Sequence, residues 1–263
     1  MNFISNINLE LNHKTIVLVY MLYFGDTVAL TPFLEVLRRA APDSKIILVM
    51  DGNYLDAMEY NPCIDEIIPV KRKELGISGT IQLGRKLHSY HPDLLFVLHG
   101  TARTTLLGLN IRAKTWIGRP GTRLDGLLMD YPIHISDEKE QCAITYLNAL
   151  KRIGVTDISC EGMKLYSCPA WDEGAKKFFE SYGIQRGNKL AGYSVGSTRI
   201  EKDWPAERFG QVAEHFAKKG YRPVFFGIKR EMELVEQAVK GLKCDPIIAA
   251  DQLSMGEFIA AAS

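Results

Sequence analysis

The sequence of 263 residues lacks the features of a secreted, metal-binding or membrane-spanning protein. Its five cysteines are scattered, odd in number and without C-x-x-C spacing, which predicts reduced thiols and no metal site. The longest early apolar run, residues 16–22, is too short to cross a bilayer. The N-terminal stretch MNFISNINLELNHK does not have the form of a signal peptide. We therefore expect a cytoplasmic protein.

A charge imbalance is also missing. Lysine and arginine number 32 against 31 aspartates and glutamates, so the formal net charge is +1 and no long block of like charge occurs. A dominant attraction to nucleic acid is therefore not implied. We interpret the short basic run at residues 71–73 as a solvated loop.

Apolar strand-like runs alternate with helix-like periods through the first half of the chain, and 46% hydrophobic residues suffice for a sizeable core. This alternation predicts an α/β fold with a parallel sheet covered on both faces. The expected strands are 15–21, 45–51, 65–70, 94–99 and 115–118, and the expected helices are 26–39, 54–60, 77–90 and 104–109.

The second half repeats this architecture after an amphipathic connecting helix at residues 137–154. Two such sheets would face each other across a cleft, where we expect the chemistry. The expected strands are 190–195, 222–227 and 246–249, and the expected helices are 172–182, 206–219 and 231–242.

A lone carboxylate, Asp26, lies at the turn from the first strand to the first helix. In open α/β sheets, ligands bind beyond the carboxyl ends of the strands, and this is the first such end. Gly25 would permit a φ angle that other residues resist. Asp26 either belongs to a functional site or caps the helix by accepting bonds from its free N–H groups. The dinucleotide fingerprint G-x-G-x-x-G is absent here, which argues against a nicotinamide enzyme.

A comparable turn lies between residues 192 and 209. The strand ends through Gly196, Ser197 and Thr198, the chain passes Lys202, and a helix begins at Pro205. Backbone N–H groups, small hydroxyls and a lysine suit a phosphate or pyrophosphate. A plain helix N-terminus with proline in its first turn explains the same residues, and both interpretations stay open on these features. The segment is not a P-loop, because G-x-x-x-x-G-K-[ST] is missing.

Three segments, in order, resemble the heptosyltransferases of glycosyltransferase family 9, which act in lipopolysaccharide assembly. The first, residues 16–51, carries a glycine–aspartate pair, a small apolar run and Thr-Pro (GDTVALTP). The second, residues 93–119, ends a strand in a polar residue and glycine before a helix. The third, residues 192–227, carries Lys-x-Trp-Pro (KDWP). The resemblance covers essentially the whole chain.

The resemblance implies a GT-B fold, in which two Rossmann-like domains face each other across a cleft. Residues 1–154 would bind the acceptor and residues 155–263 the nucleotide-sugar donor. The family inverts the anomeric configuration without a metal, and no other cofactor is implied. Asp26 matches the family's general base, a role that suits a carboxylate within reach of the acceptor hydroxyl. Gly196, Ser197, Thr198 and Lys202 match the turn that contacts the donor diphosphate.

The remaining candidate residues follow from the same resemblance. Glu231 matches a family acid that contacts the nucleoside, although the helix dipole also favours a carboxylate at this position. An anionic lipopolysaccharide inner core would suit Arg103, Arg119 and Arg123, which lie near strand ends. His99 would line the cleft, and a hydrogen-bonded histidine at a packed edge is the alternative.

The implied reaction transfers heptose from ADP-heptose to a lipopolysaccharide core or a related, lipid-linked oligosaccharide, with peripheral contact at the inner face of the inner membrane. Two alternatives stay open. A GT-B-type sugar-nucleotide epimerase or hydrolase would carry several acids and histidines in the cleft, whereas this chain shows chiefly Asp26. The other is a non-catalytic nucleotide-binding remnant, because the chain stops at residues 253–263, where the family continues to an Asp-Thr-Gly segment. We accordingly expect an incomplete, truncated donor domain and self-association through an exposed edge strand.

Overall fold

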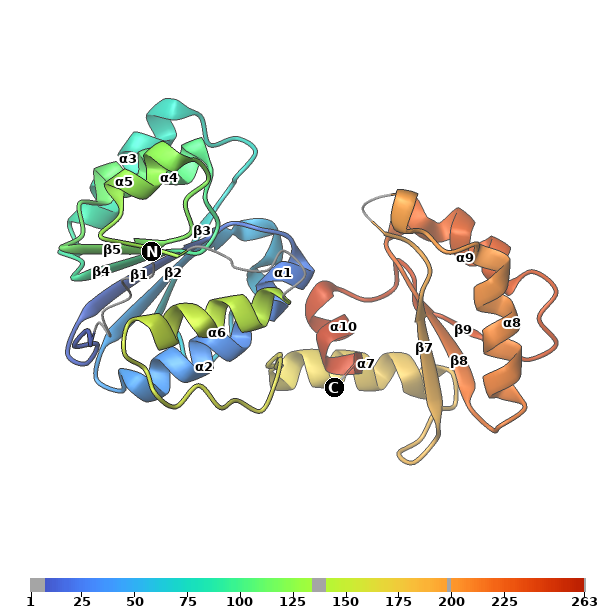
Figure 1. Ribbon diagram of the computed structural model, residues 1–263. Coiled ribbons are helices and arrows are strands. Elements are labelled where there is room, and N and C mark those ends of the chain that lie inside the picture. Colours follow the sequence, from blue (N-terminus) through green and yellow to red (C-terminus); the bar gives the residue numbers. More distant parts are fainter. Residues whose placement is uncertain (1–7, 134–140, 198–199, 263) are drawn as a thin grey trace. The chain divides into compact units, whose positions relative to one another are not determined.

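The computed structural model describes residues 8–133, 141–197 and 200–262, without the side chains of residues 123, 124 and 200. The chain divides into two compact units, Met1–Tyr166 and Ser167–Ser263 (Figure 1). Residues 155–166, which were expected in the second domain, belong to the first unit in this division. Val155, Ile158, Cys160 and Leu165 pack against the core of that unit.

The first unit is built on a parallel sheet with the strand order β3-β2-β1-β4-β5-β6. Its central strands β1 and β4 are apolar and buried except for Thr15, which begins β1, as expected for a sheet covered on both faces. Ile16 pairs with Ile46 on one side and with Leu94 on the other. The strands are β1 (Thr15–Tyr20), β2 (Lys45–Asp51), β3 (Glu66–Val70), β4 (Leu94–Val97), β5 (Thr115–Gly118) and β6 (Tyr131–Pro132).

Helices cover both faces of this sheet (Figure 1). Helices α2 (Thr31–Ala40) and α6 (Cys142–Arg152) lie on one face, and α3 (Ile77–His88), α4 (Ala102–Ile111) and α5 (Arg123–Leu128) lie on the other. Successive residues of β1 point to opposite cores, since Leu18 packs with α2 and α6 whereas Val17 packs on the other side. The predicted sheet with two covered faces is confirmed.

The helix predicted at residues 54–60 is wrong. A 3-10 helix, η1, runs instead over Gly52–Ala57. The carboxylate of Asp51 accepts a hydrogen bond from the backbone N–H of Asn53 at 3.1 Å, which starts the turn earlier. Tyr54 then leaves helical geometry with φ −121° and ψ 22°, so a regular α-helix does not propagate.

The helix predicted at residues 26–39 is divided into α1 (Phe24–Ala29) and α2, which meet at Leu30. Pro32 lies in the first turn of α2, where it has no N–H to donate and restricts the residue before it. The N–H of Leu30 bonds to the carbonyl oxygen of Thr27 at 3.1 Å. The hydroxyl of Thr31 donates to the carbonyl oxygen of Val28 at 2.8 Å. These two bonds close the junction.

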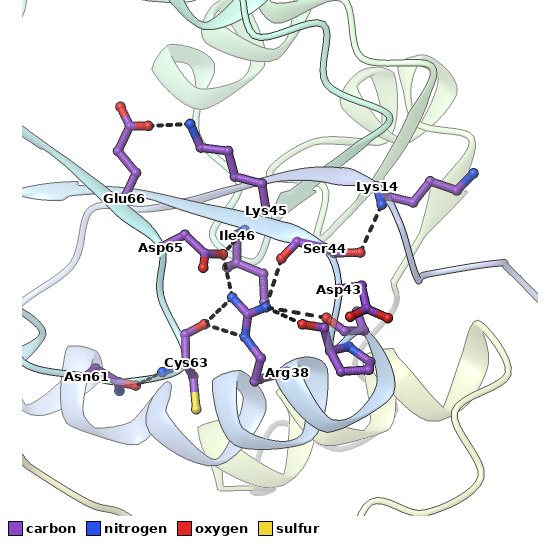
Figure 2. Close-up of polar contacts among 12 residues, drawn as sticks. Lys14, Arg38, Asp43, Ser44, Lys45, Ile46, Asn61, Cys63, Asp65 and Glu66 are labelled. Carbon is purple, nitrogen blue, oxygen red and sulfur yellow. Dashed lines mark hydrogen bonds and ion pairs between the residues drawn. The ribbon is translucent and has the colours of Figure 1, made fainter.

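Arg38 ties the end of α2 to the amino-terminal edge of the sheet (Figure 2). Its guanidinium donates to the carbonyl oxygens of Ser44 at 2.8 Å and of Cys63 at 3.2 Å, and it pairs with Asp65. The same carboxylate accepts from the backbone N–H of Ile46 at 2.7 Å. The loops at this edge are therefore held together by hydrogen bonds to Arg38 and Asp65. The candidate site lies at the opposite, carboxyl edge.

The second unit contains a smaller parallel sheet in the order β7-β8-β9, formed by Leu190–Ser194, Arg222–Phe226 and Ile247–Ile248. Helices α7 (Pro169–Ser181) and α10 (Met255–Ala262) cover one face, and α8 (Ala206–Ala217) and α9 (Met232–Val239) cover the other (Figure 1). Short 3-10 turns η2 (Ile200–Lys202) and η3 (Lys229–Glu231) follow β7 and β8. Self-association through the edge strands β7 and β9 stays a prediction.

Within the described ranges, no helix combines the length and apolar character that a membrane span requires.

Candidate functional site

A cavity of about 590 Å³ opens at the carboxyl edge of the first sheet, where ligands bind in folds of this kind. Its lining comes from segments that follow three strands: Met21 after β1, Arg72 and Lys73 after β3, and His99 after β4. Thr101, the N-cap residue of α4, and the first three residues of that helix complete it. The topology thus brings together residues that are far apart in the sequence.

Arg72 is the best-anchored cation of this cavity. Its Nε lies 3.2 Å from the carboxylate of Asp51, whose side chain is 2% exposed. Its Nη1 donates to the carbonyl oxygen of Met21 at 3.0 Å, and the guanidinium lies 4.9 Å from the ring centroid of Tyr23. The interpretation of residues 71–73 as a solvated loop is therefore wrong for Arg72. Sequence reasoning missed it because nothing local distinguishes Arg72 from its two neighbours.

Two predicted acceptor residues, Arg103 and His99, line the same cavity. Arg103 donates from Nη1 to the carbonyl oxygen of Arg72 at 2.7 Å. Burial lowers the pKa of His99, the charges of Arg119 and Arg72 lower it further, and Asp26 opposes them. The imidazole is therefore neutral at pH 7. No hydrogen bond of this ring occurs within the described residues, so the alternative of a hydrogen-bonded histidine is not supported.

Glycines bring the loop after β5 against the loop after β4. A Cβ atom on Gly100 would lie 2.2 Å from the backbone nitrogen of Gly121 and 2.3 Å from the carbonyl oxygen of Arg119. This close approach requires glycine at position 100. Arg119 is exposed on that loop. Arg123 is the first residue of α5, and its side chain lies outside the described part of the structure.

Asp26 is the third residue of α1, and Tyr23 occupies the N-cap position. Asp26 therefore does not cap this helix. Across the described residues its partly buried carboxylate has no hydrogen-bond or ion-pair partner. The expectation for Gly25 is also wrong, because it lies inside α1 without a positive φ, and a Cβ atom there would meet nothing within 4 Å. Gly25 is exposed, and a side chain at this position, directly before Asp26 in the sequence, would have room.

The second unit has its own cavity, of about 190 Å³, at the carboxyl ends of β7, β8 and β9. Ser194, Phe226 and Glu231 line it together with residues 253–255. The side chain of Glu231 is 13% exposed, and it accepts a hydrogen bond from the backbone N–H of Ile228 at 3.0 Å. Glu231 therefore stabilises the turn after β8 and also lines the cavity.

The predicted diphosphate turn lies beside this cavity. A Cβ atom on Gly196 would be 2.6 Å from the carboxyl carbon of Glu231, so the turn passes directly over that side chain. Ser197 follows and is partly buried, whereas Lys202 ends η2 as an exposed residue. Thr198 lies outside the described residues. Pro205 is the N-cap residue of α8, one position before the helix that it was expected to begin.

Among the residues that the structure describes, no group of three or more histidine, cysteine, aspartate or glutamate side chains could hold a metal ion. All five cysteines are free thiols.

Comparison with known proteins agrees with this architecture. The sequence model of glycosyltransferase family 9 (heptosyltransferase) matches residues 80–263. The chain belongs to this family and is a glycosyltransferase with the GT-B type of α/β fold. The predicted family, enzyme class and fold class are confirmed.

Individual relatives place the chain more closely. A solved glycosyl transferase family 9 structure from Veillonella parvula DSM 2008 is 37% identical with a TM-score of 0.89, and the match covers 98% of this chain and 74% of that one. Lipopolysaccharide heptosyltransferase 3 of Escherichia coli (strain K12) is 22% identical over 239 residues, 86% of this chain and 67% of the relative. The E. coli ADP-heptose lipopolysaccharide heptosyltransferase II shares the fold at 15% identity, with a TM-score of 0.68 over 94% of this chain and 76% of that one.

Proposed function

We propose that this protein is an inverting, metal-independent heptosyltransferase that moves heptose from ADP-heptose onto a lipopolysaccharide core or a related oligosaccharide. The observation that carries the proposal is Asp26, a carboxylate without a partner across the described residues, in the short helix α1 that follows the carboxyl end of β1. The named activities of the E. coli relatives support the donor and the acceptor class. We place the reaction at the cytoplasmic face of the inner membrane, with reversible contact.

Asp26 acts as the general base. It removes the proton of the acceptor hydroxyl while that oxygen attacks the anomeric carbon of the donor sugar. The bond from this carbon to the donor diphosphate breaks, and attack from the opposite side inverts the configuration. A carboxylate with no competing partner keeps its lone pairs for the incoming hydroxyl. The charge of Asp26 raises the pKa of His99, which lines the cavity of the first unit, so we place the base near this cavity.

Three cations make this cavity suitable for an anionic acceptor. Arg72, Lys73 and Arg103 line it together. Arginine binds carboxylate and phosphate with two parallel N–H donors, and Arg72 is held in place by a buried partner. We therefore assign the acceptor's anionic group to this cavity. Arg119, exposed on the loop after β5, is a further acceptor contact in our proposal, and Arg123 is kept as one on the family resemblance alone.

The second unit binds the donor. Backbone N–H groups at Gly196, the hydroxyls of Ser197 and Thr198, and the cation of Lys202 would receive the diphosphate and stabilise the charge of the leaving group. Glu231, in its cavity, would accept hydrogen bonds from the hydroxyls of the nucleoside.

The substitution Asp26→Ala tests this function. With ADP-heptose and a lipopolysaccharide of truncated core as acceptor, transfer should fall by a factor on the order of 10² or more, because the base is removed. The affinity for ADP, measured by calorimetry, should stay unchanged, since the donor residues belong to the second unit. Glu59→Ala, at an exposed carboxylate of the first unit, is the matched control. Near-normal transfer by Asp26→Ala would contradict the proposal.

A further inference from the structure

Two buried tyrosines meet next to helix α1, which carries Asp26. Tyr20 is the last residue of β1 and is 1% exposed, and Tyr146 belongs to α6 and is 5% exposed. Their hydroxyl oxygens are 2.7 Å apart, and their rings pack edge to face with centroids separated by 5.6 Å. Neither hydroxyl is used by the mechanism described above.

The hydroxyl of Tyr20 also contacts helix α1, because it donates to the backbone carbonyl oxygen of Asp26 at 3.1 Å. A phenol has one proton, so Tyr146 must be the donor in the bond between the two hydroxyls. The carbonyl of Asp26 lacks its usual helical donor. Four residues later, the N–H of Leu30 bonds to Thr27 instead, since α1 ends before Pro32. Tyr20 supplies the missing donor.

We propose that Tyr20 is a positioning residue for Asp26 and that Tyr146 fixes the direction of the Tyr20 hydroxyl. This inference rests on the proposed function, in which Asp26 is the general base. Helix α1 has only six residues, and within the described part of the chain the Asp26 carboxylate has no partner of its own. The place of the carboxylate therefore depends on the backbone that bears it. A displaced base loses rate because proton transfer needs hydrogen-bond distance.

The hydroxyls of Tyr20 and Tyr146 can hold the Asp26 backbone over a wide pH range. Burial raises the pKa of both phenols, that of Tyr146 to about 12. Both hydroxyls therefore keep their protons across the pH range in which a carboxylate changes its charge, and the bond to the Asp26 backbone persists.

Tyr20→Phe and Tyr146→Phe separate positioning from packing. Both variants lose the hydroxyl pair, but only Tyr20→Phe loses the bond to Asp26. With ADP-heptose and a lipopolysaccharide of truncated core, we expect kcat to fall about tenfold in Tyr20→Phe with both KM values unchanged. In Tyr146→Phe we expect a smaller fall, about threefold, because the Tyr20 hydroxyl keeps its bond to Asp26 but loses the partner that orients it. In the Asp26→Ala background, Tyr20→Phe should have no further effect, because the group being positioned is gone.

Hydrogen–deuterium exchange gives a readout that needs no turnover. The amides of α1 should exchange faster in Tyr20→Phe than in the wild type, and those in Tyr146→Phe should change less. Equal losses in the two tyrosine variants, or a loss that persists in the Asp26→Ala background, would overturn the inference. Reduced transfer by Asp26→Ala together with normal kcat and normal exchange in Tyr20→Phe would overturn the inference alone. Full transfer by Asp26→Ala would overturn the proposed function as well.

Discussion

Arg72 is held by partners within the protein and still has N–H donors for a ligand. Its Nε binds Asp51 and its Nη1 binds the carbonyl of Met21, while Nη2 has no partner among the described residues. A guanidinium fixed in this way loses little conformational entropy when it binds an anion. The fixed geometry distinguishes it from Lys73, an exposed neighbour in the same cavity.

Arg72→Met should raise the acceptor KM about tenfold, because a charge-assisted contact is lost. It should also lower the free energy of unfolding by about 1–3 kcal/mol, since the buried carboxylate of Asp51 would lose its ion-pair partner. Initial-rate kinetics and urea unfolding measure the two effects. Lys73→Met is the control, and its free energy of unfolding should change by less than about 0.5 kcal/mol. A normal acceptor KM in Arg72→Met would remove Arg72 from the acceptor site.

The same substitution, glycine to alanine, should have opposite effects on stability at positions 25 and 100. Gly25→Ala places a methyl group in open space inside a helix, so stability should stay equal or rise by about 0.5–1 kcal/mol. Under the proposed function transfer should nevertheless fall, because the methyl group adds bulk at the exposed residue directly before the base. Gly100→Ala should instead lower the Tm, since its Cβ would meet backbone atoms at 2.2 Å. Full transfer by Gly25→Ala would show that no substrate passes close to this position.

At the scale of the elements, strands were easier to predict than turns. The limits of β2 and β5 were predicted correctly, because apolar β-branched runs end there at charged or glycine residues. The division at Leu30 was missed, since the apolar spacing of a helix continues across it. The role of Arg72 could not be predicted, because its partner is set by the register that pairs Asp51 with Val70. Such a contact between distant segments has no local signal.

The same pairing of β2 with β3 carries an ion pair between Lys45 and Glu66 at 2.7 Å, visible in Figure 2. The hydrogen bond from Lys45 lowers the pKa of Glu66 from its ordinary 4.5, and a hydrogen bond from Tyr90 lowers it further. A carboxyl group whose pKa is lowered by folding stabilises the folded state at pH values above its ordinary pKa. This stabilisation is lost as the pH falls through the lowered pKa.

Glu66→Gln should therefore reduce the free energy of unfolding at neutral pH, and the difference from the wild type should shrink as the pH falls below the ordinary value of 4.5. Urea unfolding at a series of pH values measures the difference. Glu74→Gln is the control, because its ion pair with Lys71 is largely exposed and should contribute little. A difference between wild type and Glu66→Gln that stays constant with pH would show that the pair does not stabilise the strands electrostatically.

At the scale of the whole molecule, each unit carries a cavity at the carboxyl edge of its own sheet. The chemistry of the two cavities differs. The first is lined by three cations and a neutral histidine, whereas the second combines the carboxylate of Glu231 with Phe226, Leu253 and Phe258. An anionic acceptor group suits the first, and a nucleoside with ring faces and hydroxyls suits the second.

If the second cavity binds the donor, nucleotide binding should be selective and should depend on residues of the second unit. In calorimetric titrations, ADP and ADP-heptose should bind, and UDP and UDP-glucose should bind at least about tenfold more weakly.

Glu231→Gln should weaken the binding of ADP about tenfold, because charge-assisted hydrogen bonds to the nucleoside hydroxyls become neutral ones. Glu233→Gln, at an exposed neighbour on α9, should leave the affinity unchanged. Arg72→Met should also bind ADP normally. If ADP affinity followed Arg72 rather than Glu231, donor and acceptor would have to exchange places in the mechanism.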